Sequence, residues 1–518
     1  MENTQRKVRV RFAPSPTGGL HMGGVRTALF NYLFAKKHGG DFLLRIEDTD
    51  QTRYVNGAEE YIVEALQWSG IHIDEGVSKG GPFAPYRQSE RKDAGLYQPF
   101  ADQLVRDGHA YLAFDTAEEL DAMRKRLEAA KVVSPQYNAV SRQHMRNSLT
   151  LPEDEVKRLL QEKVPHVVRL KVPRNEEIRF HDLIRGWVSV NSATIDDKVL
   201  LKSDGMPTYH LAHIVDDHLM NISHIIRGEE WLPSAPSHVL IWRFLGLEAS
   251  MPHLVHLPLI LKPDGNGKLS KRDKSGIPMF PLNWHDERTG ESYVGYRESG
   301  FFPEAFTNML SLLGWNPGTT QEIFSMEELI AQFSIERVSK SGARFDPEKT
   351  KWFNQQYLRL KTDQELAELF APQLKVKLDE LGLPMPDSEK LIVFCKLMKE
   401  KAHFVHEFWS LGSYFFLMPE KYDEVVIQKR WNAAAKGFFE ALHKDLENLS
   451  SFDALSTENQ FKQTAERMGI APGQVMQLFR VLLSGVGGGP ALYEMMEWMG
   501  KESVLARFEN ALKALPKV

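Results

Sequence analysis

The first group of residues that could do chemistry follows a short alternating stretch near the N-terminus. It is the run Pro14-Ser15-Pro16-Thr17-Gly18-Gly19-Leu20-His21-Met22-Gly23-Gly24. A loop that opens a helix offers free backbone N–H groups and the positive end of the helix dipole, and both favour phosphate. Gly23 and Gly24 would let a nucleotide approach the backbone, and His21 can donate to phosphate oxygens. The alternative is a simple Pro/Gly turn before a helix, and the run alone does not decide between the two.

The second group is the basic run Lys268-Leu269-Ser270-Lys271-Arg272, which is flanked by Gly265, Gly267 and Gly276. Three cations within five residues on a glycine-hinged loop suit a mobile clamp on a polyphosphate. The alternative is a solvated basic loop. The spacing of a Walker phosphate-binding loop is absent from this run.

The elements around the first run follow an α/β order. Val8, Val10 and Phe12 alternate with charged residues, which predicts a strand. A helix pattern covers residues 25–37 and stops at a Gly-Gly pair, and a second strand is expected over 41–46. This strand–loop–helix–strand order predicts the start of a parallel sheet.

The middle of the chain predicts mixed α and β structure. Thr116 and Glu119 form a capping-box pattern, from which a helix runs to about residue 131. Short strands are expected over 167–172 and 187–190. This stretch therefore looks like an insertion into the first domain. The α/β pattern resumes at 199–201, 222–226 and 254–261.

Beyond about residue 324 only helices are expected. Three capping-box patterns pair Ser325 with Glu328, Thr362 with Glu365, and Thr457 with Gln460. Apolar residues at helical spacing run through this region: Leu391, Phe394, Met398, Ala402, Val405 and Trp409.

Composition limits the class of protein. The 518 residues are 42% hydrophobic and 26% charged, which excludes a disordered chain. The formal charge of -5 argues against a non-specific nucleic-acid coat but leaves room for a specific RNA partner. The only cysteine, Cys395, excludes an internal disulfide and a cysteine zinc site. Without an apolar signal core or a spanning run, the chain is expected to be soluble and cytoplasmic, with no membrane partner.

The two runs together resemble the paired signatures of class I aminoacyl-tRNA synthetases. Further stretches are similar to bacterial glutamyl-tRNA synthetases, and they stand in that family's order from Arg11 to Trp231: R-F-A-P-S-P-T-G, R-I-E-D-T-D, P-Y-R-Q-S-E-R, K-S-D-G-M-P-T-Y-H-L-A and R-G-E-E-W. The resemblance implies ligation of L-glutamate to tRNA-Glu through a glutamyl-adenylate, with ATP and Mg²⁺ as substrate and no covalent nucleophile on the protein.

The resemblance also implies an architecture. The fold class is α/β, with a Rossmann-like catalytic domain (1–108 and 199–324, the second half carrying the K-L-S-K-R loop and a stem-contact region), an inserted α+β acceptor-arm domain (109–198) and an all-α anticodon-binding region (325–518). The family is commonly monomeric, so a monomer is expected.

Site residues follow from the motif match. Those expected to line the glutamate pocket are Arg11, Ala13, Ser15, Glu47, Tyr209, His213 and Arg227. Those expected along the ATP are Pro14, His21, Gly23, Gly24, Glu230, Leu261, Lys268, Leu269, Ser270, Lys271 and Arg272. His21, Lys268 and Lys271 are the expected catalytic residues, and Lys399 and Lys401 are candidates for contact with tRNA.

Charge arithmetic agrees with this set. Glutamate carries two carboxylates and one ammonium, and buried charges need partners. Arg11 and Arg227 would supply the cations and Glu47 the anion, although the motif match leaves open which arginine takes which carboxylate. Taken without the motif, Glu47 would be assigned to a solvated loop at a strand end.

Some residues depart from the family pattern. His213 stands where relatives often carry a different polar residue. Tyr111-Leu112-Ala113-Phe114 offers no cysteine where some bacterial members bind zinc, so no zinc is expected. The stretch 281–293 is longer than in compact relatives, and its role is open. Gly485, Gly487, Gly488 and Gly489 resemble a phosphate loop, but the absence of a preceding strand favours a turn between helices.

Four other functions fit the sequence less well. A glutamyl-queuosine-type tRNA modifier lacks the helical region, and a glutaminyl enzyme has a β-rich C-terminal part. A small-molecule nucleotidylyltransferase would not need about two hundred additional helical residues. A non-catalytic RNA-binding relative does not require His21 and the basic run. Whether tRNA-Gln is also glutamylated cannot be read from the sequence.

Overall fold

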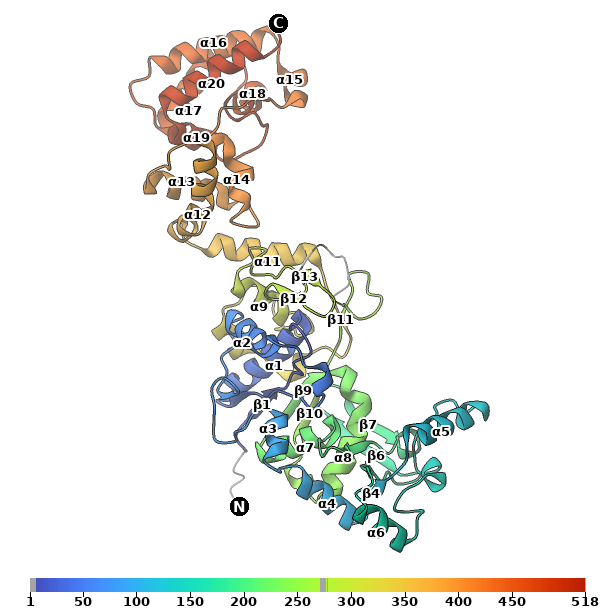
Figure 1. Ribbon diagram of the computed structural model, residues 1–518. Helices are drawn as coiled ribbons and strands as arrows, with labels where there is room; N and C mark the ends of the chain where they lie inside the picture. Colours follow the sequence, from blue (N-terminus) through green and yellow to red (C-terminus); the bar gives the residue numbers. More distant parts are fainter. Residues whose placement is uncertain (1–5, 271–275, 277, 518) are drawn as a thin grey trace. The chain divides into compact units, whose positions relative to one another are not determined.

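The computed structural model describes residues 6–270, 276 and 278–517, and it divides into two compact units, Met1–Thr350 and Lys351–Val518 (Figure 1). Helix α11 (Pro347–Leu360) runs across this division. The expected boundaries between the catalytic halves, the insertion and the helical region remain predictions.

The first unit is built on parallel strands. One sheet has the order β1 (Arg9–Phe12), β2 (Asp41–Leu44), β3 (Glu75–Gly76). A second has the order β7 (Gly186–Asn191), β6 (Glu177–Asp182), β10 (His253–Leu257), β9 (His224–Gly228), in which only the β6–β7 pair is antiparallel. Strand β9 lies beside β1, where the Ser223 N–H donates to the Arg9 carbonyl. The chain therefore leaves β1 toward β2 on one side and reaches β9 on the other, which is a topological switch point.

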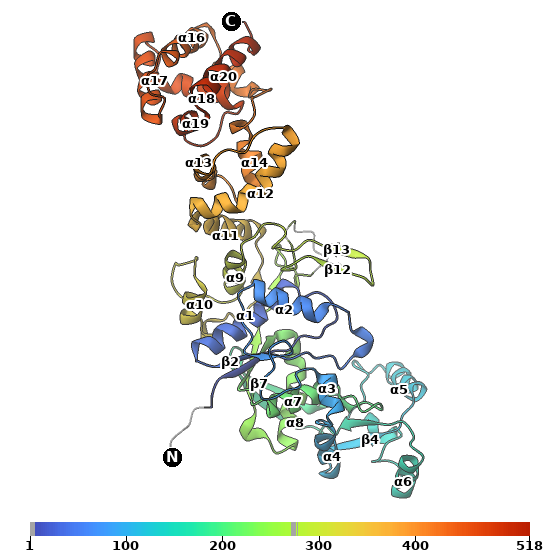
Figure 2. The ribbon, with the colours of Figure 1, turned by 60° about the vertical axis from the view of Figure 1, so that its left-hand side comes forward.

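Helices cover both faces of these strands (Figures 1 and 2). Helix α1 packs on β1, β2 and β9, while the side chains of α7 and α8 enter the core on the other side. The helices of this unit before α11 are α1 (Met22–Lys37), α2 (Ala58–Trp68), α3 (Gln88–Asp93), α4 (Gln98–Arg106), α5 (Ala117–Ala129), α6 (Glu153–Gln161), α7 (Tyr209–Leu219), α8 (Ala235–Phe244), α9 (Pro303–Ser311) and α10 (Met326–Gln332). This is the Rossmann-like arrangement that the sequence predicted.

Smaller sheets complete the unit. Antiparallel strands β4 (Ala110–Ala113), β5 (Val167–Leu170) and β8 (Val199–Leu201) form a third sheet within and beside the expected insertion. Strands β11 (Ile260–Leu261) and β14 (Ala343–Arg344) pair in parallel, and β12 (Trp284–Asp286) and β13 (Glu291–Tyr293) form a hairpin. The β6–β7 pair also lies within the expected insertion, but it extends the sheet of β9 and β10.

The second unit is helical throughout its described part. Its helices after α11 are α12 (Asp363–Leu381), α13 (Ser388–Lys399), α14 (Glu407–Gly412), α15 (Glu424–Arg430), α16 (Ala433–Glu447), α17 (Ala454–Met468), α18 (Pro472–Ser484), α19 (Leu492–Met499) and α20 (Lys501–Ala514). Short 3₁₀ helices in the two units are η1 (Gln51–Arg53), η2 (Ser141–His144), η3 (Ser192–Thr194), η4 (Glu229–Ser234), η5 (Glu248–Ser250), η6 (Ile335–Arg337) and η7 (Ser413–Phe415).

Local sequence signals located most elements. The capping boxes at Thr116, Ser325 and Thr362 are all formed. The box predicted at Thr457 is wrong, because Asp453 caps α17 by accepting from the Ser456 N–H and so starts the helix earlier. Of the apolar residues at helical spacing over 391–409, Leu391, Phe394 and Met398 lie in α13 and Trp409 in α14, while Ala402 and Val405 lie between the two helices.

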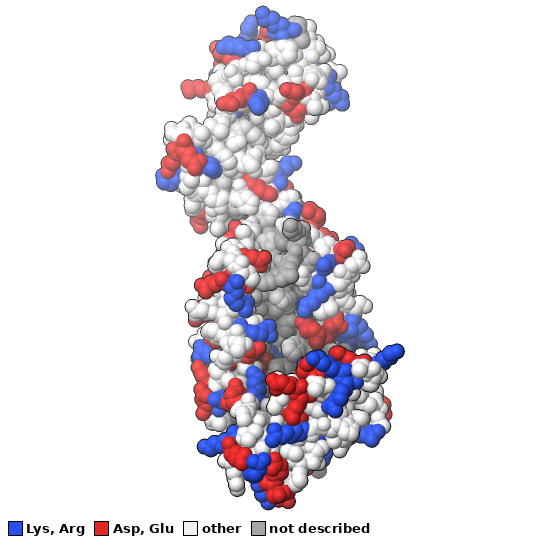
Figure 3. Space-filling view, turned by 45° about the vertical axis from the view of Figure 1, so that its right-hand side comes forward, with Lys and Arg blue, Asp and Glu red and all other residues white. Residues whose placement is uncertain are grey.

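Charge is mixed on the described part of the face drawn in Figure 3. On the face drawn in Figure 3, basic and acidic side chains are interspersed on both units, without one broad area of a single sign. Among the described residues, no helix is both long and apolar enough to cross a bilayer.

Candidate functional site

A cavity of about 540 Å³ lies at the switch point between β1 and β9. The carboxyl ends of parallel strands meet at one edge of a sheet, so residues that end β1, β2, β9 and β10 converge there. Arg11 lies in β1, Glu47 follows β2, and Arg227 lies in β9 opposite His256 of β10. Residues far apart in the sequence are thus brought to one place by strand order alone.

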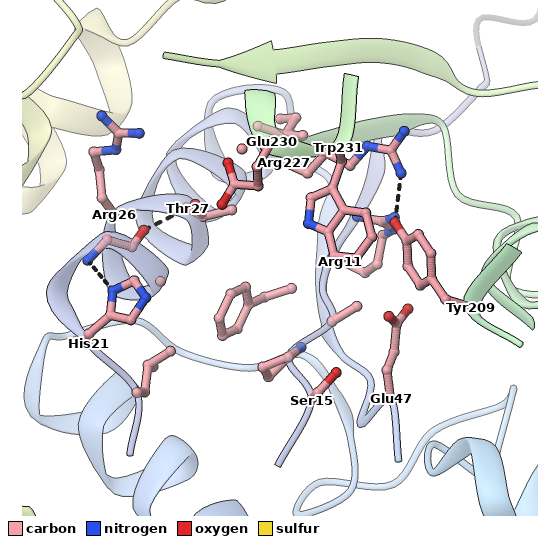
Figure 4. A pocket seen from close by; sticks show the side chains of 18 of the residues that line it. Arg11, Ser15, His21, Arg26, Thr27, Glu47, Tyr209, Arg227, Glu230 and Trp231 are labelled. Atoms are coloured by element: carbon pink, nitrogen blue, oxygen red, sulfur yellow. Dashed lines mark hydrogen bonds between the residues drawn. The ribbon is translucent and has the colours of Figure 1, made fainter. Parts of the chain in front are cut away.

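Most of the expected site residues line this one cavity. They are Arg11, Ala13, Pro14, Ser15, His21, Gly23, Gly24, Glu47, Tyr209, Arg227, Glu230, Lys268 and Leu269. Figure 4 shows two groups: Arg11, Glu47, Tyr209 and Arg227 come together on one side, and His21 stands on the other. The cavity therefore has an end rich in buried charge and an end formed by the two signature runs.

A buried charge network holds the first end. Asp217 accepts from Arg11 Nε at 3.0 Å and from Arg45 at 2.7 Å, both through its Oδ1 atom. Arg45 also donates to Glu47 Oε1 at 3.1 Å, and Arg45 and Asp217 are fully buried. Burial acts to raise the pKa of Asp217, but Arg11 and Arg45 hold it well below its usual range. Asp217 is therefore an anion that fixes both guanidinium groups.

The pKa of the Glu47 carboxyl shifts in the direction opposite to that of Asp217. Burial raises the pKa of Glu47, while the positive charges of Arg45 and Arg11 act against this rise. Its backbone N–H donates to the Pro14 carbonyl at 3.0 Å, which ties the end of β2 to the loop after β1. Only one of its carboxylate oxygens has a hydrogen bond to a described residue, so the other can accept from a bound cation.

Among the described residues, the hydrogen-bond partners of Arg227 are all neutral. Arg227 donates to the Tyr209 hydroxyl at 2.7 Å, to His256 Nε2 at 3.0 Å and to His238 Nδ1 at 3.4 Å. The salt bridges of the described residues include none to Arg227, although the residue is 5% exposed. A buried guanidinium without a carboxylate partner is a binding site for an anion.

Tyr209 completes this end of the cavity. Burial raises the pKa of its hydroxyl, so the group keeps its proton. The oxygen already accepts from Arg227, and the proton remains available for donation to a ligand.

His213 does not reach the cavity. It is fully buried behind Tyr209, with the two rings stacked at 4.9 Å, and it contacts Asp217 Oδ2 at 3.3 Å. Burial lowers the pKa of His213 to about 3. The expectation that it lines the pocket is corrected: the ring supports Tyr209 and Asp217 from behind, because helix α7 turns this position into the core.

The start of helix α1, beside His21, differs from the expectation that its backbone N–H groups are free to bind phosphate. The first N–H groups of α1 already have partners: Met22 N donates to the Met279 carbonyl, Gly23 N to His21 Nδ1, and Gly24 N to the His21 carbonyl. Because Nδ1 accepts, the ring hydrogen is on Nε2, which has no hydrogen-bond partner among the described residues and can donate to a ligand. Desolvation by the cavity walls, with the cation of Lys268, lowers the pKa of His21. The imidazole, and not a row of free N–H groups, is the donor offered here.

Lys268 faces this end of the cavity. Its Nζ donates to Glu230 Oε1 at 3.1 Å, and both side chains are about half exposed. Gly228 lets Glu230 fold back against the chain, since an added Cβ would come within 2.0 Å of a Glu230 carboxylate oxygen. The Lys268 ammonium is thus held at the mouth by a carboxylate that an arriving anion can displace.

Other expected residues lie near the cavity or outside the described part. The Leu261 side chain contacts Gly342, and its neighbour Ile260 lines the cavity. Ser270 lines an adjoining cavity of about 450 Å³. Lys271 and Arg272 lie outside the described residues.

The tRNA candidates are in the second unit. The Lys399 ammonium is engaged by the Lys361 carbonyl at 2.5 Å and by Asp363 at 3.2 Å. Lys401 is exposed and borders an open cavity of about 1400 Å³.

Gly485, Gly488 and Gly489 lie between α18 and α19 and border the same cavity. Gly485 is the left-handed cap of α18 (φ +80°). The turn predicted for this glycine cluster is confirmed.

The stretch 281–293 contains the β12–β13 hairpin, which packs on the loop before His21. Trp284 occupies the space beside Gly19, where an added Cβ would come within 2.6 Å of the indole. Arg288 donates to the Thr17 carbonyl at 2.9 Å, and Tyr61 donates to the Leu282 carbonyl at 2.7 Å. The hairpin therefore braces the first signature run.

The comparisons with known proteins agree with this geometry. Residues 7–352 match the family model of class I tRNA synthetases (E and Q), catalytic domain, and residues 365–512 match an anticodon-binding domain. The chain is 55% identical to the glutamate–tRNA ligase of Cytophaga hutchinsonii over 99% of both chains, and 52% identical to that of Bacteroides fragilis over 99% of both.

The chain belongs to the family of glutamate–tRNA ligases.

A solved structure supports the same assignment. The crystal structure of a glutamate tRNA ligase from Elizabethkingia meningosepticum, in complex with its amino acid, matches with a TM-score of 0.91 and 50% identity over 98% of this chain and 100% of that one. The α/β catalytic domain followed by a helical anticodon-binding domain, predicted from the sequence, is thus confirmed.

The sequence did not point to several residues of the site. Asp217 and Arg45 form its buried network, and Arg26, Thr27 and Trp231 line the cavity. Arg45 and Trp231 stand inside the family-like stretches R-I-E-D-T-D and R-G-E-E-W, so a signal existed. Asp217 stands outside those stretches, and only its contacts reveal its role. No group of three or more metal-binding side chains is found among the described residues.

The network makes Arg45 a stability determinant. Arg45→Met would leave Asp217 and Glu47 buried without this cation, and breaking a buried pair in this way costs about 3–5 kcal/mol. The free energy of unfolding, measured by urea denaturation followed by circular dichroism, is expected to fall by that amount. Arg158→Met is the matched control, because Arg158 is an exposed residue paired with Glu155 and Glu162. The urea midpoint of this variant should equal that of the parental protein. Equal midpoints for the two variants would contradict the network.

Proposed function

We propose that this chain ligates L-glutamate to tRNA-Glu in two steps, with MgATP as co-substrate. The observation that carries the proposal is the buried end of the cavity, where Arg11, Arg227 and Glu47 converge. Two guanidinium groups and one carboxylate complement the two carboxylates and one ammonium of glutamate. The family of the chain adds independent support.

The first step forms glutamyl-adenylate. A carboxylate oxygen of the α-carboxyl group attacks the α-phosphorus of ATP, the new O–P bond forms, and pyrophosphate leaves with the electrons of the broken P–O bond. Catalysis then rests on alignment and on cations placed where phosphate charge develops. His21 through Nε2–H and Lys268 through its ammonium are the described groups for this task, and Mg²⁺ travels with the ATP phosphates. Pro14, Gly23, Gly24, Glu230 and Leu269 line the same end.

The second step transfers glutamate to RNA. A ribose hydroxyl oxygen at the tRNA 3′ end attacks the mixed anhydride carbonyl, and the ester C–O bond forms. The C–O bond to the phosphate breaks, AMP leaves with the electrons of that bond, and the hydroxyl proton is released to solvent. The helical second unit is assigned to the anticodon, and Lys401 is the better placed of the two tRNA candidates because Lys399 is engaged within the unit.

The direct test is aminoacylation with labelled glutamate on purified tRNA-Glu and tRNA-Gln. Glutamate attachment to tRNA-Glu that needs both ATP and Mg²⁺ is expected. Attachment to tRNA-Gln as well would widen the RNA specificity without changing the chemistry. A protein that charges neither RNA with glutamate would overturn the proposal.

Lys268 is expected to act on the rate of activation. Losing one cation that faces a transition-state phosphate costs about 10²–10³ in rate. Lys268→Ala should therefore lower kcat of glutamate-dependent ATP–pyrophosphate exchange by that factor and leave KM for glutamate near parental. Lys125→Ala, which removes an exposed lysine of α5, is the control. Parental kcat in Lys268→Ala would remove Lys268 from the clamp.

Arg11 is expected to exclude glutamine. Its Nε donates to Asp217, and its terminal N–H groups bond to none of the residues that the structure describes, so they are left for the ligand. A guanidinium has no acceptor for an amide NH₂. Polar mismatch in a desolvated site discriminates by about 10⁴ or more. Arg11→Gln should lose most glutamate activation. It should also narrow the ratio of the ATP–pyrophosphate exchange rate with glutamate to the rate with glutamine, measured with tRNA present. If Arg227→Gln alone narrows the ratio, the selectivity belongs to Arg227.

A further inference from the structure

Arg227 is the end of a buried chain of hydrogen bonds that crosses the sheet. Its Nε donates to His256 Nε2 at 3.0 Å, and His256 Nδ1 lies 2.7 Å from Asp182 Oδ2. Arg227, His256 and Asp182 are 5%, 0% and 0% exposed. The Asp182 carboxylate is therefore separated from the Arg227 guanidinium by one imidazole ring.

The pattern of donors fixes the form of His256. The Arg227 Nε–H can only donate, so His256 Nε2 is an acceptor and the ring hydrogen is on Nδ1, where it donates to Asp182. Burial lowers the pKa of His256, which agrees with a neutral ring. A neutral ring with this hydrogen placement can accept from Arg227 without neutralising its charge.

Both carboxylate oxygens of Asp182 are occupied by hydrogen-bond donors. Its Oδ1 accepts from the backbone N–H groups of Ile184 and Arg185, at 2.9 and 2.8 Å. Its Oδ2 accepts from the His256 backbone N–H at 3.1 Å as well as from Nδ1. All four neighbours are donors, so a carboxylate fits this place and an amide NH₂ does not.

We propose that Asp182 and His256 are positioning residues for glutamate binding: Asp182 fixes the hydrogen of His256 on Nδ1, and His256 Nε2 then holds the Arg227 guanidinium toward the cavity. This inference rests on the proposed function, because it takes Arg227 as a cation that binds a glutamate carboxylate. It adds two residues that do not touch the substrate.

The chemistry explains why a direct carboxylate is not used. A carboxylate bonded directly to Arg227 would offset part of its positive charge, as Asp217 does for Arg11, whereas water would be a poor partner in a site this buried. A neutral imidazole backed by a carboxylate orients the guanidinium and leaves its positive charge for the ligand. The contrast is Arg9, which pairs directly with Asp41 and Glu75 on the opposite end of β1.

The decisive variant is Asp182→Asn. In either orientation the amide NH₂ of the new asparagine faces an N–H donor. When the NH₂ faces His256, the ring must accept at Nδ1 and carry its hydrogen on Nε2. That Nε2–H then faces the Arg227 Nε–H, so two donors meet and the hydrogen bond is lost. We expect KM for glutamate to rise about tenfold to a hundredfold, the effect of leaving a buried polar group unsatisfied. KM for ATP should stay within about twofold, because the defect lies at the glutamate end of the cavity.

Two substitutions of His256 separate positioning from mere structural support. His256→Gln keeps an oxygen that can accept from Arg227, and His256→Leu keeps bulk without an acceptor. We expect KM for glutamate to rise clearly more in His256→Leu than in His256→Gln. His253→Gln is the matched control, since His253 is an exposed histidine on the same strand, and it should be parental.

The measurement is ATP–pyrophosphate exchange with tRNA present, with KM and kcat determined for glutamate and for ATP in each variant. Parental KM for glutamate in Asp182→Asn and His256→Leu would overturn the inference. So would an equal rise of KM for both substrates, or equal losses in the Gln and Leu variants, because these results describe a structural role. Absence of glutamate-dependent exchange in the parental protein would instead refute the proposed function, so the two failures are distinguishable.

Discussion

The site depends on one buried anion, Asp217. It lies under the switch point of the sheet and holds Arg11 from β1 and Arg45 from the end of β2 at hydrogen-bond distance. Arg45 in turn holds Glu47. One carboxylate therefore orients a cation and an anion on the same wall of the cavity, and this is what a zwitterionic ligand needs. Such a network is costly to bury and is kept only where every member has a partner.

The two arginines that face the cavity are held by opposite means. Arg11 shares an anionic partner with Arg45, while Arg227 is surrounded by the neutral acceptors Tyr209, His238 and His256. The first arrangement gives rigidity, and the second leaves a desolvated positive charge in place for an anion. The other end of the cavity is looser: Lys268 is about half exposed and bonded to a single carboxylate. A rigid amino-acid end and an adjustable phosphate end suit a reaction that must fix one substrate and release pyrophosphate from the other.

The sequence predicted the architecture and most of the cavity wall, since short motifs name Arg11, His21 and Lys268 directly and the strand ends bring them together. It misplaced His213, because a histidine on an amphipathic helix gives no local sign of which way it faces. It gave no indication of Asp182, which lies in a segment expected to belong to the insertion. The pairing of β6 with β10 joins residues 74 positions apart, and local periodicity does not encode such a contact. The helix end before Gly23 was also expected to be free, but its N–H groups are bonded within the unit.

The most direct measurement of the central role of Asp217 is the kcat/KM for glutamate of Asp217→Asn in ATP–pyrophosphate exchange with tRNA present. The substitution keeps the size of the side chain and removes the charge that orients Arg11 and Arg45. With a charge-assisted hydrogen bond worth about 1.5–3 kcal/mol, kcat/KM for glutamate should fall by about tenfold to a hundredfold while KM for ATP is kept. Asp74→Asn, at a carboxylate paired with Lys36 away from the cavity, should be parental. A folded Asp217→Asn protein with parental kcat/KM for glutamate would contradict the account.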